Sequence, residues 1–283
     1  AASDVYKRQL REEFAKQPED RQKVTNVNLR GFSMADAIAT QNPSRVITLC
    51  PTIGEKDRGV TAQVSAYCPI QKRNNSNLVC SEYVTLRGTK LAMQRVDKTI
   101  KSLMIPELPK FVWWKATPNT EQKLFRSLCE ASNCIIMDSC YFSDPESEFI
   151  KMHELIENET YIADLNWHRL SAWQELIAAS FDPPERRAAL WEVDTITIDY
   201  EKGNTAQALM FLGWFASRLN WEPVSYIELD SDYDIAHIKF TGGNDQEILA
   251  QLGAIPTADF GEIPGDLVGL RLGSVSYTHL RAH

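Results

Sequence analysis

Two runs of alternating apolar and polar residues mark the clearest elements of the chain. In VTAQVSAYCPI, from Val60 to Ile70, every second residue is apolar, and NLVCSEYVTLRG repeats the alternation with Glu82 as an interruption. A period of two is typical of a strand with one apolar face. The polar QKRNNSN between the runs is turn material. The pattern therefore predicts an antiparallel hairpin.

The same alternation limits the register of this hairpin. If both apolar faces lie on one side, the numbers of opposed residues must have an even sum, which favours a three-residue loop at Arg73–Asn75. Cys68 then lies opposite Cys80, with Cα atoms roughly 4.5–5.5 Å apart. That spacing allows a disulfide, but two small apolar side chains packing side by side fit the pattern as well.

A strand–helix–strand pattern follows in the middle of the chain. LPKFVWWKATP reads as a strand with Trp113 and Trp114 adjacent, NTEQKLFRSLCEAS as a helix, and NCIIMDSCYF as a short strand. Such a βαβ unit implies parallel strands and a right-handed crossover. Because neighbouring side chains on a strand point to opposite faces, both tryptophans are buried only if both faces of the sheet are covered.

The remaining elements complete an α/β pattern: a mixed sheet with flanking helices, in two subdomains. We expect an N-terminal domain over residues 27–160 and a C-terminal domain over residues 161–272. Helices are predicted before Pro43, from Thr89 to Leu103, from Leu170 to Phe181, and in NTAQALMFLGWFASRLNW; strands are predicted at Arg45–Cys50, in WEVDTITIDY, and as an antiparallel pair in PVSYIELD and IAHIKFTGG. The signal weakens from Gln246 onward, and SDPES reads as a loop.

The two ends of the chain do not resemble natural protein sequence, and the net charge limits the possible partners. SDVYKRQ and SVSYTHLRAH resemble translated sequencing-adapter read-through, so residues 1–9 and 274–283 are expected to be artefactual and the chain a fragment. The formal net charge is −8 without a basic cluster, which argues against binding to nucleic acid or anionic membranes. With no apolar run of about 18 residues and no signal peptide, we expect a cytoplasmic protein.

Residues that could carry chemistry are few. Phosphate-binding glycine motifs are absent, and HELIE at His153–Glu157 lacks the second histidine of a zinc helix, so neither a metal nor a cofactor is expected. Asp138, Asp164 and His168 could act as acid–base groups, although helix capping is the commoner use of such aspartates. EKGNTAQ could bind an anion at the helix start after Gly203, or Asn204 or Thr205 could simply cap that helix.

Seven blocks of sequence together resemble the OpcA family, the glucose-6-phosphate dehydrogenase assembly proteins. The likeness runs from about Gln41 to Phe240, and its strongest blocks are the LP-x-x-x-WW stretch, which ends at Trp114, and D-L-x-W-x-R-L-x-x-W between Asp164 and Trp173. The blocks are PSRVITL, VSAYC, CSEYVTLRG, LPKFVWWKATP, CIIMDSCYFSDP, ADLNWHRLSAWQELIAASFDPP and ALMFLGWFASRLNW. The resemblance implies a non-catalytic assembly or allosteric activator of this dehydrogenase in the oxidative pentose phosphate pathway.

The resemblance also implies thioredoxin-linked redox control, with thioredoxin as a second candidate partner. Six cysteines in a chain of this length do not form a disulfide scaffold, and buried thiols are the default. The family's redox residues do not map onto named positions here. The redox candidates are therefore Cys68, Cys80, Cys129, Cys134 and Cys140, and a Cys134–Cys140 bond would require the chain to turn back after Asp138.

A protein that acts by docking needs aromatic anchors at its surface. We predict that one of Trp113 and Trp114 packs in the core while the other lies at the partner-facing edge, next to Lys115. The other partner-binding candidates are Asp164, Trp167 and Arg169, whereas Trp173 is expected to pack in the core.

The alternative to an assembly factor is a sugar-phosphate-binding enzyme of the same pathway. It would use Asp138 and Asp164 with an anion site near Gly203. These groups would have to converge within about 10 Å in a pocket, whereas a docking protein needs an apolar patch with an exposed tryptophan.

Overall fold

The computed structural model describes two compact units, each considered by itself below. The described residues are 34, 37–39, 41–52, 59–67, 80–229, 234–256, 263–274 and 277–282. Unit 1 comprises Ala1–Leu108 with Gln122–Leu124, and unit 2 comprises Pro109–Glu121 with Phe125–His283. The α/β class with mixed β-structure and flanking helices is confirmed. Among the described residues, no helix is both long and apolar enough to span a membrane.

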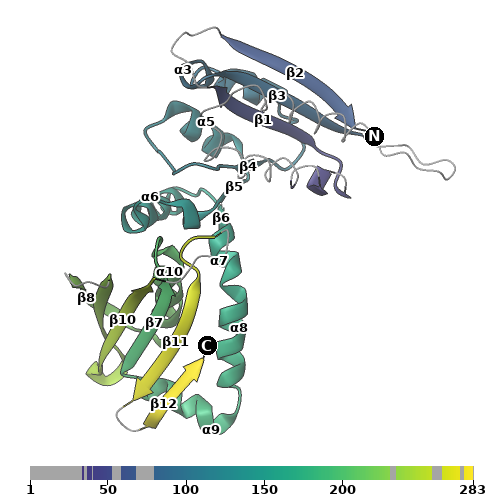
Figure 1. Ribbon diagram of the computed structural model, residues 1–283. Helices are drawn as coiled ribbons and strands as arrows, with labels where there is room; N and C mark the ends of the chain where they lie inside the picture. Colours follow the sequence, from purple (N-terminus) through teal and green to yellow (C-terminus); the bar gives the residue numbers. More distant parts are fainter. Residues whose placement is uncertain are drawn as a thin grey trace, which may run out of the picture. The chain divides into compact units, whose positions relative to one another are not determined.

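Unit 1 contains a three-stranded sheet in the order β1-β3-β2 (Figure 1). β3 (Ser81–Thr89) pairs in parallel with β1 (Arg45–Thr52) and antiparallel with β2 (Val60–Tyr67). Every opposed pair of the hairpin has an even sum of residue numbers, from Val60 opposite Gly88 to Tyr67 opposite Ser81. The predicted parity is thus confirmed, while Cys68 and the loop Arg73–Asn75 lie outside the described residues.

The apolar face of the hairpin is buried unevenly. Val84 and Leu86 of the central strand β3 are buried, whereas Val64 of β2 is exposed. This difference follows from the position of β2 at the edge of the sheet.

The single helix expected over residues 89–103 is wrong, because two shorter helices occupy this segment. α3 (Lys90–Met93) begins at Thr89, whose side chain accepts a hydrogen bond from the Ala92 backbone, and α4 (Asp97–Leu103) follows. Between them, Arg95 and Val96 donate to carbonyls three residues earlier, a tighter turn that ends α3. Met93, Val96 and Ile100 are all buried, so the apolar spacing continues through the break.

Unit 2 begins with a parallel three-stranded sheet in the order β4-β5-β6, formed by β4 (Phe111–Trp113), β5 (Cys134–Met137) and β6 (Ile162–Asp164). The predicted βαβ unit is confirmed, with α5 (Lys123–Ala131) between the first two strands. α6 (Pro145–Glu157) connects the next two and starts inside SDPES, where a loop was expected. Asp144 caps this helix by accepting from the Ser147 N–H, and Pro145 suits its first turn.

One cluster of buried residues lies between this sheet and its two crossover helices. The buried members are Phe125, Ile135, Met137, Phe142 and Met152, and the partly buried residues packed against them are Val112, Trp114, Cys129, Phe149, Leu155 and Ile162. Both α5 and α6 contribute to it together with all three strands, so the two helices cover the same face of the sheet.

A six-stranded mixed sheet follows, in the order β12-β11-β7-β10-β9-β8. Its strands are β7 (Thr195–Glu201), β8 (Glu222–Leu229), β9 (Ile235–Thr241), β10 (Glu247–Ile255), β11 (Leu267–Ser274) and β12 (Tyr277–Ala282). The predicted antiparallel pairing of β8 with β9 is confirmed. β10 and β11 were not predicted after Gln246; in β10, half-buried positions such as Leu249 and Ile255 are also apolar and obscure the alternation. β12 lies in the end that was expected to be artefactual.

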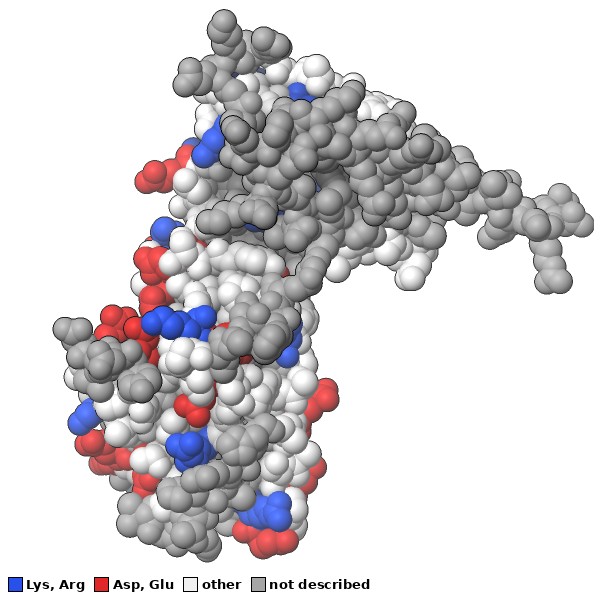
Figure 2. Space-filling view, viewed as in Figure 1, with Lys and Arg blue, Asp and Glu red and all other residues white. Residues whose placement is uncertain are grey.

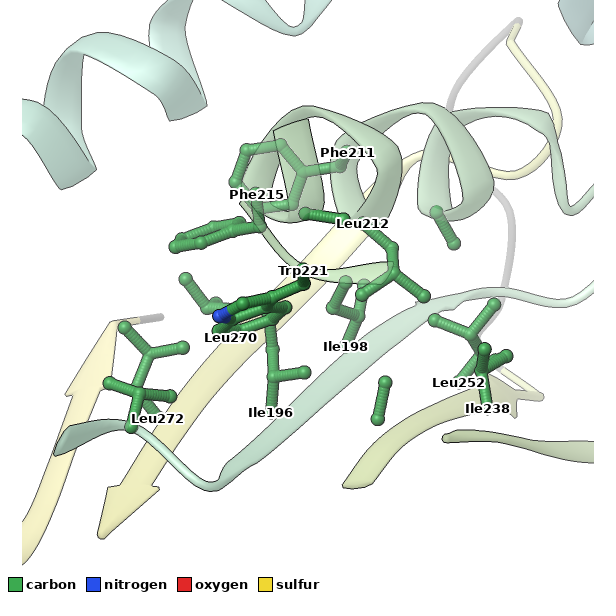
Figure 3. Packing of buried hydrophobic residues seen from close by; sticks show 14 of the residues in the cluster. Ile196, Ile198, Phe211, Leu212, Phe215, Trp221, Ile238, Leu252, Leu270 and Leu272 are labelled. Atoms are coloured by element: carbon green, nitrogen blue, oxygen red, sulfur yellow. The ribbon is translucent and has the colours of Figure 1, made fainter. Parts of the chain in front are cut away.

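α10 (Ala206–Leu219) provides most of the helical side of the second core. In Figure 3, Phe211, Leu212 and Phe215 lie over Ile196 and Ile198 of β7, with Trp221 between the helix and the strands. The remaining helices of unit 2 are α7 (Leu165–Arg169), α8 (Ser171–Ser180) and α9 (Pro184–Arg187), and the 3-10 turns are Ser139–Tyr141, Ala188–Glu192 and Gly243–Asp245.

Candidate functional site

The adjacent tryptophans take opposite faces of the β4-β5-β6 sheet. Trp114 joins the core, with its ring centroid 4.8 Å from that of Phe125 and its Nε1 donating to the Thr117 carbonyl at 3.2 Å. Trp113 lies on the other face, and the Lys115 ammonium sits 4.8 Å from its ring centroid. This is a cation–π contact, and burial lowers the pKa of Lys115. The tryptophans therefore differ in role as well as in position.

The strand register extends the Trp113 side into an apolar face. Phe111 is two residues before Trp113 and so shares its face. Trp113 pairs with Ile136 of β5, and Tyr161 precedes Ile162, which is on the core side. Phe111 is 66% exposed and Tyr161 is 69% exposed. We call Phe111, Trp113, Ile136 and Tyr161 the aromatic face.

The aromatic face has the composition of a protein-binding surface. Parallel sheets are normally covered on both sides, yet both crossover helices pack on the opposite face. Trp and Tyr are also the side chains that most often dominate interface energies. Neither Phe111 nor Tyr161 was among the candidates predicted from the sequence, although alternation from Trp113 could have identified Phe111.

The carboxylates predicted for acid–base chemistry meet at the carboxyl ends of β5 and β6. The Arg169 guanidinium donates two hydrogen bonds of 2.7 Å to Asp138. Asp164 Oδ1 accepts from the backbone N–H groups of Ser139 at 3.0 Å and Asn166 at 2.9 Å. Burial raises the pKa of Asp164, and its Oδ2 has no hydrogen-bond partner among the described residues.

Asn166 occupies the centre of this polar network. Its Nδ2 donates to Ser139 Oγ at 3.1 Å, and its Oδ1 accepts from Arg169 at 3.2 Å and from Gln207 at 2.9 Å. Gln207 also donates to Asp266 at 2.7 Å. Asn166 and Ser139 are fully buried, so the network fills the interior of unit 2.

The start of α10 is capped from within the protein. Asn204 Oδ1 accepts from the Ala206 N–H at 2.8 Å, and Asn204 Nδ2 donates to the Phe142 carbonyl at 2.9 Å. Asn204 is buried, whereas the Thr205 side chain makes no cap. Of the two alternatives for EKGNTAQ, the structure has the simple Asn204 cap, which already uses the Ala206 N–H at this helix start.

The other predicted site residues are dispersed. Trp167 is 39% exposed on α7, and His168 beside it is exposed. Arg169 and Asp164 are used inside the network described above. Trp173 packs against the second core, with its ring edge-on to Phe211 at 6.2 Å, as predicted.

The cysteines do not form a thiolate site in the described part of the chain. Cys50, Cys129, Cys134 and Cys140 are free thiols, so Cys134 and Cys140 are not bonded to each other. Burial raises the pKa of each, for Cys129 to about 11, and a protonated thiol is a poor nucleophile. Cys80 is disulfide-bonded.

Metal-binding groups are likewise absent among the described residues: no set of three or more His, Cys, Asp or Glu side chains could hold an ion. His153 of the HELIE segment instead lies 3.4 Å from Glu157, one turn along α6.

Two family models match the chain in sequence. They are described as the N-terminal and C-terminal domains of a glucose-6-phosphate dehydrogenase subunit and match residues 35–154 and 160–268. Together these two matches cover most of the chain. The chain belongs to the OpcA family. These matched ranges differ from the units of the structure, and the expected boundary at residues 160 and 161 stays a prediction.

Curated relatives in cyanobacteria carry the name OxPP cycle protein OpcA. The protein of Synechococcus elongatus is 55% identical over 251 residues, covering 89% of this chain and 56% of its own length. That of Nostoc punctiforme is 51% identical over 271 residues, covering 94% of this chain and 58% of its own length. The chain therefore spans a little over half the length of these relatives.

Solved structures show only a distant likeness. A dehydrogenase (MviM) from Clostridium difficile has a TM-score of 0.40 at 11% identity, covering 66% of this chain and 59% of its own. An oxidoreductase from Sinorhizobium meliloti has a TM-score of 0.43 at 14% identity, covering 67% of this chain and 55% of its own. These values are too low for any conclusion about activity.

Proposed function

We propose that this protein is a non-catalytic assembly partner and activator of glucose-6-phosphate dehydrogenase in the oxidative pentose phosphate pathway. Family membership and the names of the cyanobacterial relatives support this assignment. The structural observation that supports a location for this function is the aromatic face, where Trp113 lies outside the core that contains Trp114. We assign the docking of the dehydrogenase to this face.

The chemistry of the aromatic face suits a protein partner. Large aromatic side chains bury about 150–250 Å² each when they are covered, and Phe111 and Tyr161 are largely exposed. Lys115 already holds Trp113 in one orientation, which lowers the entropy lost on binding. Lys115 thereby belongs to the proposed site as a support for Trp113.

The buried polar network argues against the sugar-phosphate-binding enzyme. Asp138 and Asp164 do converge near the start of α10, as that alternative requires, but Arg169 binds both carboxylate oxygens of Asp138, and the backbone N–H groups of Ser139 and Asn166 bind Oδ1 of Asp164. With Asn204 capping α10 as well, a substrate would have to displace internal hydrogen bonds. Asp164 and Arg169 are therefore assigned to stabilisation in this proposal, and Trp167 remains a second docking candidate.

Redox regulation through thioredoxin is a further part of the proposal that rests on the family resemblance alone. The free thiols have raised pKa values and would react slowly at neutral pH. Titration of the whole chain with a thiol-specific reagent, before and after incubation with reduced thioredoxin, would show whether any cysteine changes state.

The proposed function is tested with a cyanobacterial glucose-6-phosphate dehydrogenase. We expect the chain to lower the apparent KM for glucose 6-phosphate or to shift the dehydrogenase to larger oligomers in light scattering. The double variant F111S/W113A should lose this effect and its binding. The matched control is W191A, which truncates a tryptophan that is 61% exposed outside the aromatic face. Equal binding by both variants would disprove docking at this face.

A further inference from the structure

The outer edge of β8 is a second candidate surface in unit 2. β8 ends the order of the six-stranded sheet, so only its β9 side is paired in the described structure. Val224 is 64% exposed and Ile227 is 53% exposed. Edge strands present unpaired backbone N–H and C=O groups, which can bind another extended chain.

The usable part of this edge is short and defined. Pro223 has no N–H to donate, and the register with β9 shifts between Pro223 and Ser225. Such a bulge interrupts pairing at that end of the strand. The regular stretch Ser225–Leu229 remains, which is long enough for a few backbone hydrogen bonds with an added strand.

Carboxylates gather along this edge. The Tyr226 hydroxyl lies 3.2 Å from Glu228 Oε1 and 3.4 Å from Glu146 Oε1 of α6. Burial and the charges of Asp234, Glu146 and Glu228 together raise the pKa of Tyr200 to about 12. Tyr200 is on β7, inside the sheet, so these three carboxylates share one end of the sheet, and of the three only Glu228 is on β8 itself. Figure 2 shows red acidic side chains on the side of unit 2 where β8 lies in Figure 1.

Two lysines of this sheet are already paired with acidic side chains. Lys202 pairs with Asp234 at 2.9 Å, while Lys239 is engaged with Glu247 at 3.2 Å. Glu222 adds a further exposed carboxylate at the start of β8. The edge thus combines strand geometry with a strongly negative surrounding.

We propose that the outer edge of β8 binds a basic, extended segment of another protein, which adds to the sheet as a further strand. Backbone hydrogen bonds along Ser225–Leu229 would supply affinity. Glu222 pairs with Thr241 and Glu228 with Ala236, so the two carboxylates lie on opposite faces of the sheet, and Lys or Arg side chains on either face of the segment would pair with the one on their side. A second copy of this chain is a poor occupant, because two β8 edges would bring like charges together. This surface is separate from the aromatic face and does not depend on the proposed function.

Defined peptides test the proposal on the whole chain. The probe is a fluorescein-labelled eight-residue peptide of alternating Lys and Val, titrated by anisotropy. One comparison peptide replaces Lys with Glu, and another keeps every Lys but replaces two Val with Pro. We expect the Lys–Val peptide to bind, the Glu peptide not to bind, and the Pro peptide to bind at least tenfold more weakly. If the Lys–Val and Pro peptides bound equally, charge alone would explain the binding, and the proposal that the peptide adds as a strand would be wrong.

Variants locate the binding. E222K/E228K should lower the affinity for the Lys–Val peptide at least tenfold. The control E175K/E185K makes the same charge change at exposed positions on α8 and α9 and should change this affinity less than threefold. Circular dichroism of each variant reports whether the fold is kept. Equal weakening by both pairs would contradict the assignment to β8. A dimer that E222K/E228K abolishes or strengthens, with no peptide binding, would replace the basic segment by a second copy.

Discussion

The Arg169 guanidinium and the Asp138 carboxylate form a two-pronged ion pair, with both nitrogen–oxygen distances at 2.7 Å. The pair also holds the pKa of Arg169 above its ordinary value, chiefly through the hydrogen bonds to Asp138. Two charges in this setting stabilise the fold only as long as both are present.

Removing one member should therefore cost more than removing both. We expect R169A to lower the free energy of unfolding by about 2–4 kcal/mol, less than for a fully buried pair because Arg169 is partly exposed. The double variant R169M/D138L should be closer to the wild type than R169A is. Urea denaturation of the chain checks this, and strict additivity of the single losses would contradict a coupled pair.

Truncation of the two adjacent tryptophans should have different effects: loss of Trp114 should mainly lower stability, and loss of Trp113 should mainly weaken binding. W114A removes a ring packed on Phe125 and should cost about 2–4 kcal/mol of unfolding free energy, somewhat less than a fully buried tryptophan. W113A should cost less than about 1 kcal/mol, since its ring lies outside that core. Thermal and urea unfolding measure both. The assignment of faces fails if W113A proves the more destabilising change.

Glu148 makes stability depend on pH. Its side chain is buried in α6, with Oε2 unpartnered among the described residues, and burial raises its pKa above the ordinary 4.5. As the pH rises through the interval between the unfolded and folded pKa values, the unfolded carboxyl ionises first, so stability falls.

Substitution with glutamine removes this penalty. We expect E148Q to gain unfolding free energy relative to the wild type as the pH rises from 4 to 8, because glutamine keeps the shape without ionising. Denaturant unfolding at both pH values gives the difference. E154Q, exposed on the same helix, serves as the control. A difference that stays constant with pH would show that Glu148 ionises equally in both states.

Asn204 combines two separable roles, helix capping and hydrogen bonding to the Phe142 carbonyl. N204A should lose about 2 kcal/mol of unfolding free energy, roughly 1 from the cap and 1 from the hydrogen bond. N204S can still cap α10 but cannot reach Phe142, so we expect about half that loss. Equal losses in the two variants would mean that the cap contributes nothing measurable.

Local patterns predicted the elements better than they predicted the site. The alternation in the hairpin was enough to predict that opposed residues have numbers with an even sum, and Val64 is indeed paired with Val84. The order of strand and helix was enough to predict parallel β4 and β5. Phe111 could have been identified from its alternation with Trp113 in the same strand. Tyr161 could not, because its place on that face depends on the register of β6 with β5, which lies beyond any local window.

The sequence identified Asp138 and Asp164 as acid–base candidates and made their convergence a requirement of the enzyme alternative, without predicting it. The strand β6 that ends at Asp164 was not predicted, so the meeting of the two strand ends is a finding of the structure. The sequence did not show that Asn166 would fill the space between them and the start of α10. The identity of the filling side chains decides between an open catalytic cleft and a closed interior.

Gln207 and Asn204 also determine how unit 2 comes apart. Both belong to the segment that opens α10 over the six-stranded sheet, yet their amides donate to Asn166 and to the Phe142 carbonyl, next to the parallel sheet. If either sheet unfolded alone, these buried amides would lose their hydrogen-bond acceptors. Each lost hydrogen bond would cost about 1–3 kcal/mol of free energy. Melting is thus cooperative across the two sheets, and force applied to one will be resisted by the other.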